Sequence, residues 1–190
     1  IGVRLVGSEM CIRDSCPLVM AGEAAATAHP MWTDIPFEKN QTVALELGGA
    51  HKRYNAGLAR TFQLGSGPQK VYDTANAVTE GLESVLATVR PGVTAGDVHA
   101  AWQKVLNCYG LVKESRIGYG IGVGYSPDWG EHTISLRAND STVLEKNMTL
   151  HVMLGMWMDG WGIEFSETVA VTDSGVDCLT DFPRSVIDVR

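Results

Sequence analysis

The period of the apolar residues changes twice along this chain, and this change limits the folds that the chain can adopt. Residues 42–64 alternate apolar and polar side chains, which is typical of strands. Residues 68–109 carry two apolar stripes with helical spacing, and residues 117–172 return to short apolar runs separated by glycines and polar turns. A hairpin, two helices and several further strands predict an α+β domain with a curved, mostly antiparallel sheet and covering helices.

Local signals set the expected boundaries of these elements. Gly48-Gly49 separates two alternating runs and predicts the turn of the hairpin. The first helix is expected over residues 68–89, where a Pro-Gly pair follows. Thr94 followed by Asp97 predicts the N-cap of the second helix, and Gly110 predicts its end.

Composition and charge exclude two classes of partner. The chain has 22 Asp+Glu against 15 Lys+Arg, a formal net charge of -7. Its longest basic run is Lys52-Arg53, so it lacks the basic stripe of a nucleic-acid binder and the basic helix of a peripheral membrane protein. It also has no apolar stretch of the ~18 residues that a membrane span needs. With 45% hydrophobic residues, we expect a soluble globular domain that binds neither nucleic acid nor membrane.

The cysteine pattern bears on the compartment. Cys11, Cys16, Cys108 and Cys178 form no CxxC pair and have no histidine at zinc-finger spacing. A domain of this size does not need disulfides to be stable. We therefore predict reduced thiols in a cytoplasmic protein.

The first residues read differently from the rest of the chain. Residues 1–15, IGVRLVGSEMCIRDS, lack the uninterrupted apolar core of a secretory signal and have no clean period. They resemble a peptide that recurs at the start of environmental-sequence translations, where adapter bases are read as codons. We predict that residues 1–15 are a non-native leader, the alternative being an edge strand, and that residues 16–190 are the C-terminal catalytic portion of a longer protein.

Two sequence patterns have ordinary structural explanations in place of functional ones. The alternating glycines of GYGIGVG at 118–124 do not match the GxGxxG spacing and lack the Rossmann strand and helix around them. They are better explained by close approach of the backbone to a ligand or a neighbouring strand. The five histidines form no HExxH motif, and His99 is expected to be a half-exposed helix residue.

Carboxylates in apolar strand settings are less ordinary. Glu46, Glu164 and Glu167 each have apolar neighbours, and an ionised carboxylate in such a setting costs several kcal/mol unless it is paired or ligated. A salt bridge to Arg60 or a solvent-facing position is the structural alternative for any one of them. Together they suggest an acidic pocket for a positively charged group.

Five motifs in order resemble a known family. They are LELGGAHKRYNAGLARTF from residue 45, RPGVTAGDVHAA, GYGIGVG, LEKNMTLHVMLGMW and IEFSETVAVTDSG. This order is similar to that of the pita-bread family, which contains methionine aminopeptidase, prolidase, Xaa-Pro aminopeptidase and creatinase. The resemblance covers nearly the whole chain after residue 16. It implies a pita-bread fold that is incomplete at the N-terminus, a missing N-terminal domain and a homodimer.

The resemblance also identifies the positions of the family's metal ligands. The peptidases hold two metal ions with Asp, Asp, His, Glu and Glu, and a bridging water is the nucleophile. Those positions hold, in order, Glu46, Gly57, Tyr119, Met153 and Ser166. Glycine supplies no ligand and a thioether does not hold a hard cation. We therefore expect no metal and no cofactor.

A metal-free branch of the family remains. His29 aligns with the histidine that acts as acid and base in creatinase, and GYSPDWGEHTISLR resembles the corresponding stretch of ectoine hydrolases, which open a cyclic amidine that carries a carboxylate. The resemblance implies a metal-independent hydrolase acting on a C–N bond other than a peptide bond. In this hypothesis Glu46 is the central catalytic carboxylate, His29 shuttles the proton and Glu164 assists.

Further side chains are candidates for contacts with the substrate. Indoles attract desolvated cations, and other polar groups in the same motifs can hydrogen-bond a small molecule. The candidate substrate-binding residues are Tyr119, Trp129, Glu131, Trp157, Ser166 and Glu167. Ordinary packing is the alternative for the tryptophans. Two other functions stay open: a metal-dependent aminopeptidase or prolidase, and a catalytically inactive pita-bread binding module.

Overall fold

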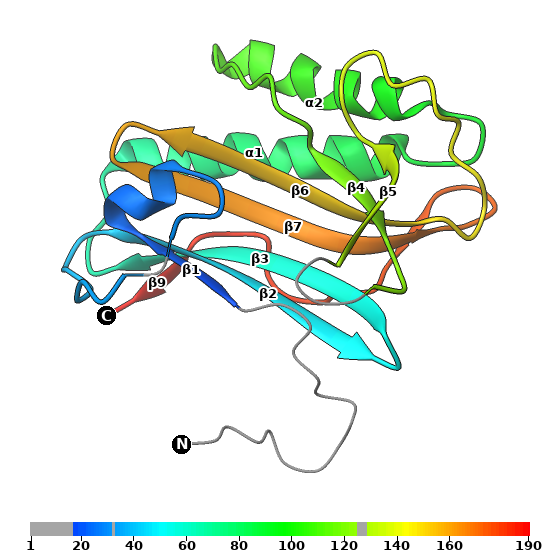
Figure 1. Ribbon diagram of the computed structural model, residues 1–190. Coiled ribbons are helices and arrows are strands. Elements are labelled where there is room, and N and C mark those ends of the chain that lie inside the picture. The colour runs from blue at the N-terminus through cyan, green and yellow to red at the C-terminus, as the bar shows by residue number, and fades with distance from the viewer. Residues whose placement is uncertain (1–16, 32, 125–128) are drawn as a thin grey trace.

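The computed structural model describes residues 17–31, 33–124 and 129–190. Within these ranges the chain forms two sheets that pack against each other, with two long helices on the outer face of one sheet (Figure 1). The predicted leader, residues 1–15, lies outside the described residues.

Both sheets are built mainly from antiparallel pairs. The first has the order β1-β2-β3-β9, with strands Leu18–Ala21, Thr42–His51, Tyr54–Leu64 and Ile187–Val189. The second has the order β5-β4-β6-β7-β8, with strands Gly130–Ser135, Gly118–Ile121, Thr149–Met158, Trp161–Val171 and Val176–Cys178. Among these pairs β3 and β9 run parallel and the rest are antiparallel, which confirms the predicted α+β class.

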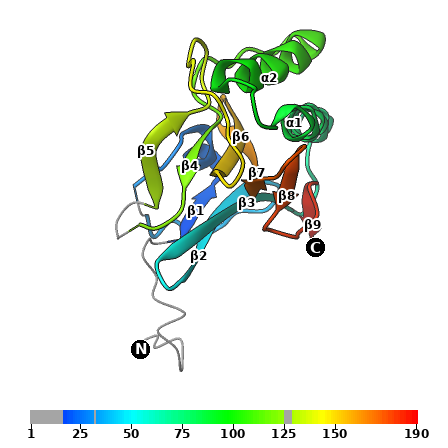
Figure 2. The same cartoon turned by 90° about the vertical axis from the view of Figure 1, so that its right-hand side faces the viewer.

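The helices are those that the 3.6-residue period predicts. α1 spans Gln69–Thr88 and α2 spans Ala95–Tyr109, while η2, Gly22–Ala26, is a short 3-10 helix. α1 packs on β6 and β7, and α2 packs on α1. Strands β6 and β7 therefore lie between the helices and the β2–β3 hairpin (Figures 1 and 2). None of the helices that the structure describes is both long and apolar enough to span a bilayer.

The predicted ends of α2 are confirmed. The side-chain oxygen of Thr94 accepts the Asp97 N–H, and the Asp97 carboxylate accepts the Thr94 N–H, which completes a capping box. Gly110 ends the helix with a φ of 65°, in the left-handed region that favours glycine.

The predicted turn of the first hairpin is wrong. β2 runs through Gly48-Gly49 to His51, and the turn is Lys52-Arg53, whose φ values are 50° and 72°. Two residues with positive φ match the right-handed twist of a tight hairpin. Gly48 serves another purpose, because a Cβ there would overlap the indole of Trp129.

Hydrogen bonds between β3 and β7 hold the two sheets together. Thr61 Oγ1 donates to the Glu164 carbonyl at 3.1 Å and accepts the Glu164 N–H at 2.8 Å. Ser166 Oγ accepts the N–H of Ala59 at 2.6 Å. Because side chains alternate along a strand, every second residue of β7 faces β3. The candidate site is built on this inner face.

Candidate active site

Glu46 lies in β2 with its side chain between the two sheets. It is 1% exposed, whereas the next residue, Leu47, is 45% exposed. The usual alternation of apolar side chains inward and polar side chains outward is reversed here. Neither carboxylate oxygen of Glu46 has a hydrogen-bond partner among the described residues. A buried carboxylate in this state needs a cationic or hydrogen-bonding partner.

The imidazole of His29 approaches this carboxylate from the segment after η2. Its Nε2 lies 3.5 Å from Oε2 of Glu46, and its side chain is 63% exposed. The φ of His29 is 53°, in the left-handed region that few histidines adopt. His29 thus connects a buried carboxylate with solvent, and an imidazole in this position can carry a proton in either direction.

Glu164 lies on the inner face of β7 and is buried. Burial raises its pKa to about 8, the negative charge of Glu46 adds to this rise, and the positive charge of Lys113 opposes it. Glu164 therefore holds a proton near neutral pH and can donate a hydrogen bond. Glu46 thus lies close to His29 and within electrostatic reach of Glu164, and the catalytic roles of the three residues stay a prediction.

Lys113 lies within electrostatic reach of Glu164, and the sequence did not predict it as a site residue. It lies in the loop between α2 and β4, is 8% exposed, and has no hydrogen-bond partner for Nζ among the described residues. The Nζ atom lies 4.0 Å from the centroid of the Trp157 ring. Burial lowers the pKa of Lys113 to about 7, with Glu164 opposing the shift. No local pattern marks this lysine, because its burial depends on β6.

The prediction that His99 is half-exposed is wrong. His99 is 5% exposed on the face of α2 that carries Val98 and Trp102 into the core. Burial lowers the pKa of His99, the backbone of Ser115 opposes this shift, and the charge of Lys113 lowers the pKa further. The helix thus contributes a neutral imidazole beside the loop of Lys113.

A line of polar side chains crosses the same interior. Trp129 Nε1 donates to the Tyr119 hydroxyl at 2.7 Å, and that hydroxyl lies 3.0 Å from Nδ1 of His151. On the other side of the ring, His151 Nε2 lies 2.8 Å from Ser166 Oγ. His151 is fully buried, and burial lowers its pKa to about 4, so the ring is neutral at physiological pH.

His151 occupies space that a ligand of the family's metal centre would need. A Cβ on Gly57 would lie 2.9 Å from Cε1 of His151, so the ring packs against the glycine itself. His151 is one of the five histidines of the sequence, and the sequence alone assigns it no role. Its place in the apolar run LHVML of an inner-facing strand is the signal that could have identified it.

The residues present do not fit a dinuclear metal centre. Of the five family positions, Gly57 and Met153 offer no oxygen or nitrogen ligand, and Tyr119 and Ser166 already hydrogen-bond to His151. The described part of the chain contains no group of three or more His, Cys, Asp or Glu side chains that could hold a metal ion. Glu46 alone keeps a carboxylate at these positions, and one carboxylate does not make a site for two hard cations.

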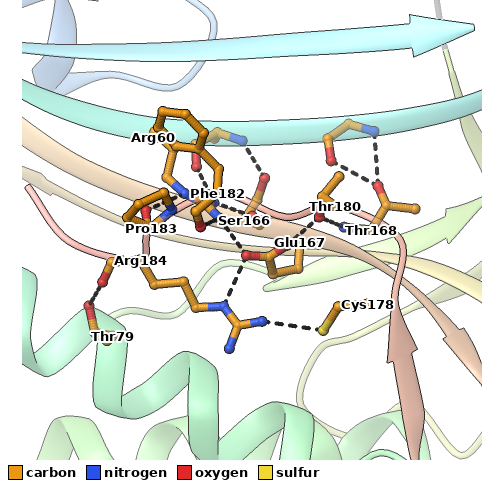
Figure 3. Close-up of polar contacts among 12 residues, drawn as sticks. Arg60, Thr79, Ser166, Glu167, Thr168, Cys178, Thr180, Phe182, Pro183 and Arg184 are labelled. Carbon is orange, nitrogen blue, oxygen red and sulfur yellow. Dashed lines mark hydrogen bonds and ion pairs between the residues drawn. The ribbon is translucent and has the colours of Figure 1, made fainter. Parts of the chain in front are cut away.

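Glu167 forms a salt bridge to Arg60, which is the structural alternative that the sequence left open. Its carboxylate accepts hydrogen bonds from Arg60 Nη2 at 2.5 Å, from Arg184 Nε at 2.9 Å and from the hydroxyl of Thr180. Figure 3 shows this carboxylate between the two guanidinium groups, facing the C-terminal segment. Both oxygens of Glu167 therefore already accept hydrogen bonds, and Glu167 stabilises the position of the C-terminal segment.

The remaining substrate-binding candidates, Trp157, Trp129 and Glu131, do not all lie at the same site. The Trp157 ring folds over Gly155, the strand partner of Glu164, and Trp129 stacks edge-on to His151 at 5.9 Å, so both indoles border the inner site. Glu131 lies on β5 and lines a different cavity of about 290 Å³ together with Tyr54. The structure thus does not bring Glu131 together with Glu46.

Comparison with known proteins agrees with the fold. Metallopeptidase family M24 matches residues 6–173, and the chain therefore belongs to that family. The solved structure of dipeptidase PepE from Mycobacterium ulcerans is 26% identical, superposes with a TM-score of 0.85, and is matched over 91% of this chain and 46% of that chain. The pita-bread fold that the motifs predict is thereby confirmed.

Individual relatives are more similar in sequence. The chain is 40% identical to an ectoine hydrolase of Halomonas elongata over 171 residues, 90% of this chain and 43% of that protein. It is also 40% identical to an uncharacterized hydrolase/peptidase of Sinorhizobium fredii over 91% of this chain and 44% of that protein. The chain thus spans less than half the length of these curated relatives.

Proposed function

We propose that this chain carries the active site of a metal-independent hydrolase that opens the ring of a cyclic amidine such as ectoine. The bond broken is a C–N bond other than a peptide bond. The observation that carries the proposal is the carboxylate of Glu46, which is 1% exposed with both oxygens lacking hydrogen-bond partners among the described residues. The 40% identity to an ectoine hydrolase of Halomonas elongata supports the substrate class.

The chemistry of a protonated amidine matches this carboxylate. An amidinium is planar and positively charged, and its two N–H groups can donate to the two oxygens of one carboxylate. Pairing of this kind offsets the cost of keeping Glu46 ionised inside the protein. Trp129 borders the same space and offers an aromatic face to a desolvated cation, whereas the Trp157 ring is in contact with Lys113.

Hydrolysis then needs one nucleophile and one proton donor. The oxygen of water ends on the amidine carbon as a carbonyl, the bond from that carbon to one ring nitrogen breaks, and the nitrogen leaves as an amine after it takes up a proton. Glu46 attacks the carbon or deprotonates the water, and both routes give the same product. His29 delivers the proton from the solvent side of Glu46. From ectoine the product is an N-acetyl-diaminobutyrate.

Glu164, Tyr119 and Ser166 have supporting roles in this proposal. The proton on Glu164 lets a second carboxyl group sit near Glu46 without adding a second negative charge. The hydroxyls of Tyr119 and Ser166 hold the imidazole of His151 against Gly57 and shape the floor of the site. Glu167 and Glu131 are left out, because the first is fully paired and the second lines another cavity.

The two alternatives are less well supported. A metal-dependent peptidase would need a set of hard ligands at five positions, and four of these are Gly57, Tyr119, Met153 and Ser166. A binding module without activity would not need a buried carboxylate that lacks hydrogen-bond partners among the described residues and lies beside an exposed histidine.

The substitution Glu46→Gln tests the proposal. We expect hydrolysis of ectoine by the full-length protein to fall by about 10³-fold or more, because an amide is neither base nor nucleophile. The thermal unfolding midpoint should be kept or raised, since the buried charge is removed. Glu83→Gln, on the exposed face of α1, is the matched control and should keep full activity. Substantial turnover by the Glu46 variant would overturn the assignment.

We also propose that the protein works in the cytoplasm as a homodimer. The free thiols of Cys108 and Cys178 support the compartment, and membership of the pita-bread family supports the dimer. Analytical ultracentrifugation of the full-length protein should give the mass of two chains, and the mass of one chain would contradict the dimer.

A further inference from the structure

Lys113 is a buried basic side chain that the proposed mechanism does not use. Its ammonium has three N–H donors, yet none has a hydrogen-bond partner among the described residues, and the side chain is 8% exposed. Leaving such a group unpaired inside a protein costs several kcal/mol, and contact with an aromatic face offsets part of this cost. The lysine therefore lacks an anionic or polar partner.

The position of this ammonium is fixed from two sides. On the backbone side, Gln103 Nε2 of α2 donates to the carbonyl of Lys113 at 2.6 Å, which ties the loop to the helix. On the side-chain side, Nζ lies 4.0 Å from the centroid of the Trp157 ring, and that ring is itself packed over Gly155. A donor held in this way loses little conformational entropy when it binds a ligand.

The carboxyl groups near Lys113 in the described part of the chain form no ion pair with its ammonium. Glu164 is within electrostatic reach of Lys113, but no ion pair within 4.0 Å joins the two described side chains. No carboxylate therefore lies at ion-pair distance from Nζ of Lys113 among the described residues. Glu164 is also within electrostatic reach of Glu46, so the three side chains share one part of the interior.

We infer that Lys113 binds an anionic group of the substrate, so that the site selects a small zwitterion with an amidinium toward Glu46 and a carboxylate toward Lys113. This inference rests on the proposed function and narrows its substrate class. Glu164 lies on the inner face of β7, within electrostatic reach of both Glu46 and Lys113. Trp157 borders the substrate on the side of Lys113.

The substitution Lys113→Met tests this inference with two substrates. One is ectoine, and the other is the same 2-methyl-tetrahydropyrimidine ring without the carboxylate. Methionine keeps the length and the packing on Trp157 but removes the charge. The full-length protein should show a KM for ectoine that rises about 10- to 100-fold, the usual effect of losing one hydrogen bond between charged groups, with kcat changed less than about threefold.

The same variant should hydrolyse the carboxylate-free ring as well as the wild type does, within about twofold. If wild-type turnover of that ring is too slow to follow, its inhibition constant against ectoine replaces the rate and should be equally unaffected. Lys113→Arg should restore part of the affinity for ectoine, because it keeps the positive charge. Lys104→Met, on the exposed face of α2, is the matched control and should behave like the wild type.

The outcomes separate this inference from the proposed function. An equal loss on both substrates, or an unchanged KM for ectoine, would overturn the role of Lys113 while leaving a cyclic-amidine hydrolase intact. Absence of ectoine turnover in the wild-type protein would instead overturn the proposed function and the inference with it.

Discussion

Three glutamates in the apolar strands differ in their polar partners in the structure. Glu46 has no hydrogen-bond partner among the described residues, Glu164 holds a proton, and Glu167 is paired with two arginines. All three are buried to a similar degree. Burial alone therefore does not identify a catalytic carboxylate. The informative property is the partner, since a paired carboxylate stabilises the fold and an unpaired one is available to a ligand.

The role of Glu167 can be tested at this scale. Glu167→Gln leaves Arg60 and Arg184 without their counter-ion, and we expect the free energy of unfolding to fall by about 3–5 kcal/mol. Asp173→Asn, which breaks the exposed pair with Lys146, is the matched control and should cost less than about 1 kcal/mol. Urea unfolding of both variants measures this difference. Unchanged stability with a raised KM for ectoine would make Glu167 a substrate-binding residue instead.

Sequence alone could identify Glu46 and Glu164 but not Lys113, and it could place His151 in an apolar strand without revealing its role. The two glutamates stand out because a charge interrupts an apolar strand. Lys113 lies in a polar loop that looks exposed, and its burial results from a strand more than 40 residues later. His151 gains its role from Gly57 and Ser166, which are also distant in sequence. Such contacts leave no local periodicity to detect.

At the scale of elements, the packing of β3 against β6 depends on Gly57. A Cβ at this position would lie 2.9 Å from His151, whose ring is held by Tyr119 and Ser166 and cannot easily move. Gly57→Ala should therefore cost about 1–3 kcal/mol of unfolding free energy. Gly49→Ala is the matched control, because nothing lies within 4 Å of the added methyl group, and it should change stability by less than about 0.5 kcal/mol.

A second substitution makes this test specific. In a His151→Ala background the ring is gone, so Gly57→Ala should cost about as little as Gly49→Ala. Guanidinium unfolding of the four variants gives the coupling energy between the two positions. Equal costs in both backgrounds would show that the glycine is needed for another reason.

The helices were the most predictable elements and the first hairpin the least. Both helices carry continuous apolar stripes, and α2 has local caps in Thr94, Asp97 and Gly110 whose chemistry does not depend on the rest of the fold. The hairpin turn was misplaced because Gly48-Gly49 imitates a turn. Gly48 is required by the indole of Trp129, which is distant in sequence, so no local pattern reveals this contact.

For the whole molecule, the family fold is kept while the metal-ligand positions are changed. The two sheets stay joined through hydrogen bonds between β3 and β7, and β9 pairs with β3. None of these contacts needs the five ligand positions to be acidic. A fold can thus be retained while its metal-ligand positions change, and function must be argued from the site.

The most direct test of this account is turnover of ectoine by the full-length protein after treatment with a chelator, with the product followed by NMR. We predict ring opening at the same rate before and after chelation, with no stimulation by Mn²⁺ or Co²⁺, because Glu46 and His29 supply the chemistry. Activity that disappears with the chelator and returns with either metal would contradict the account.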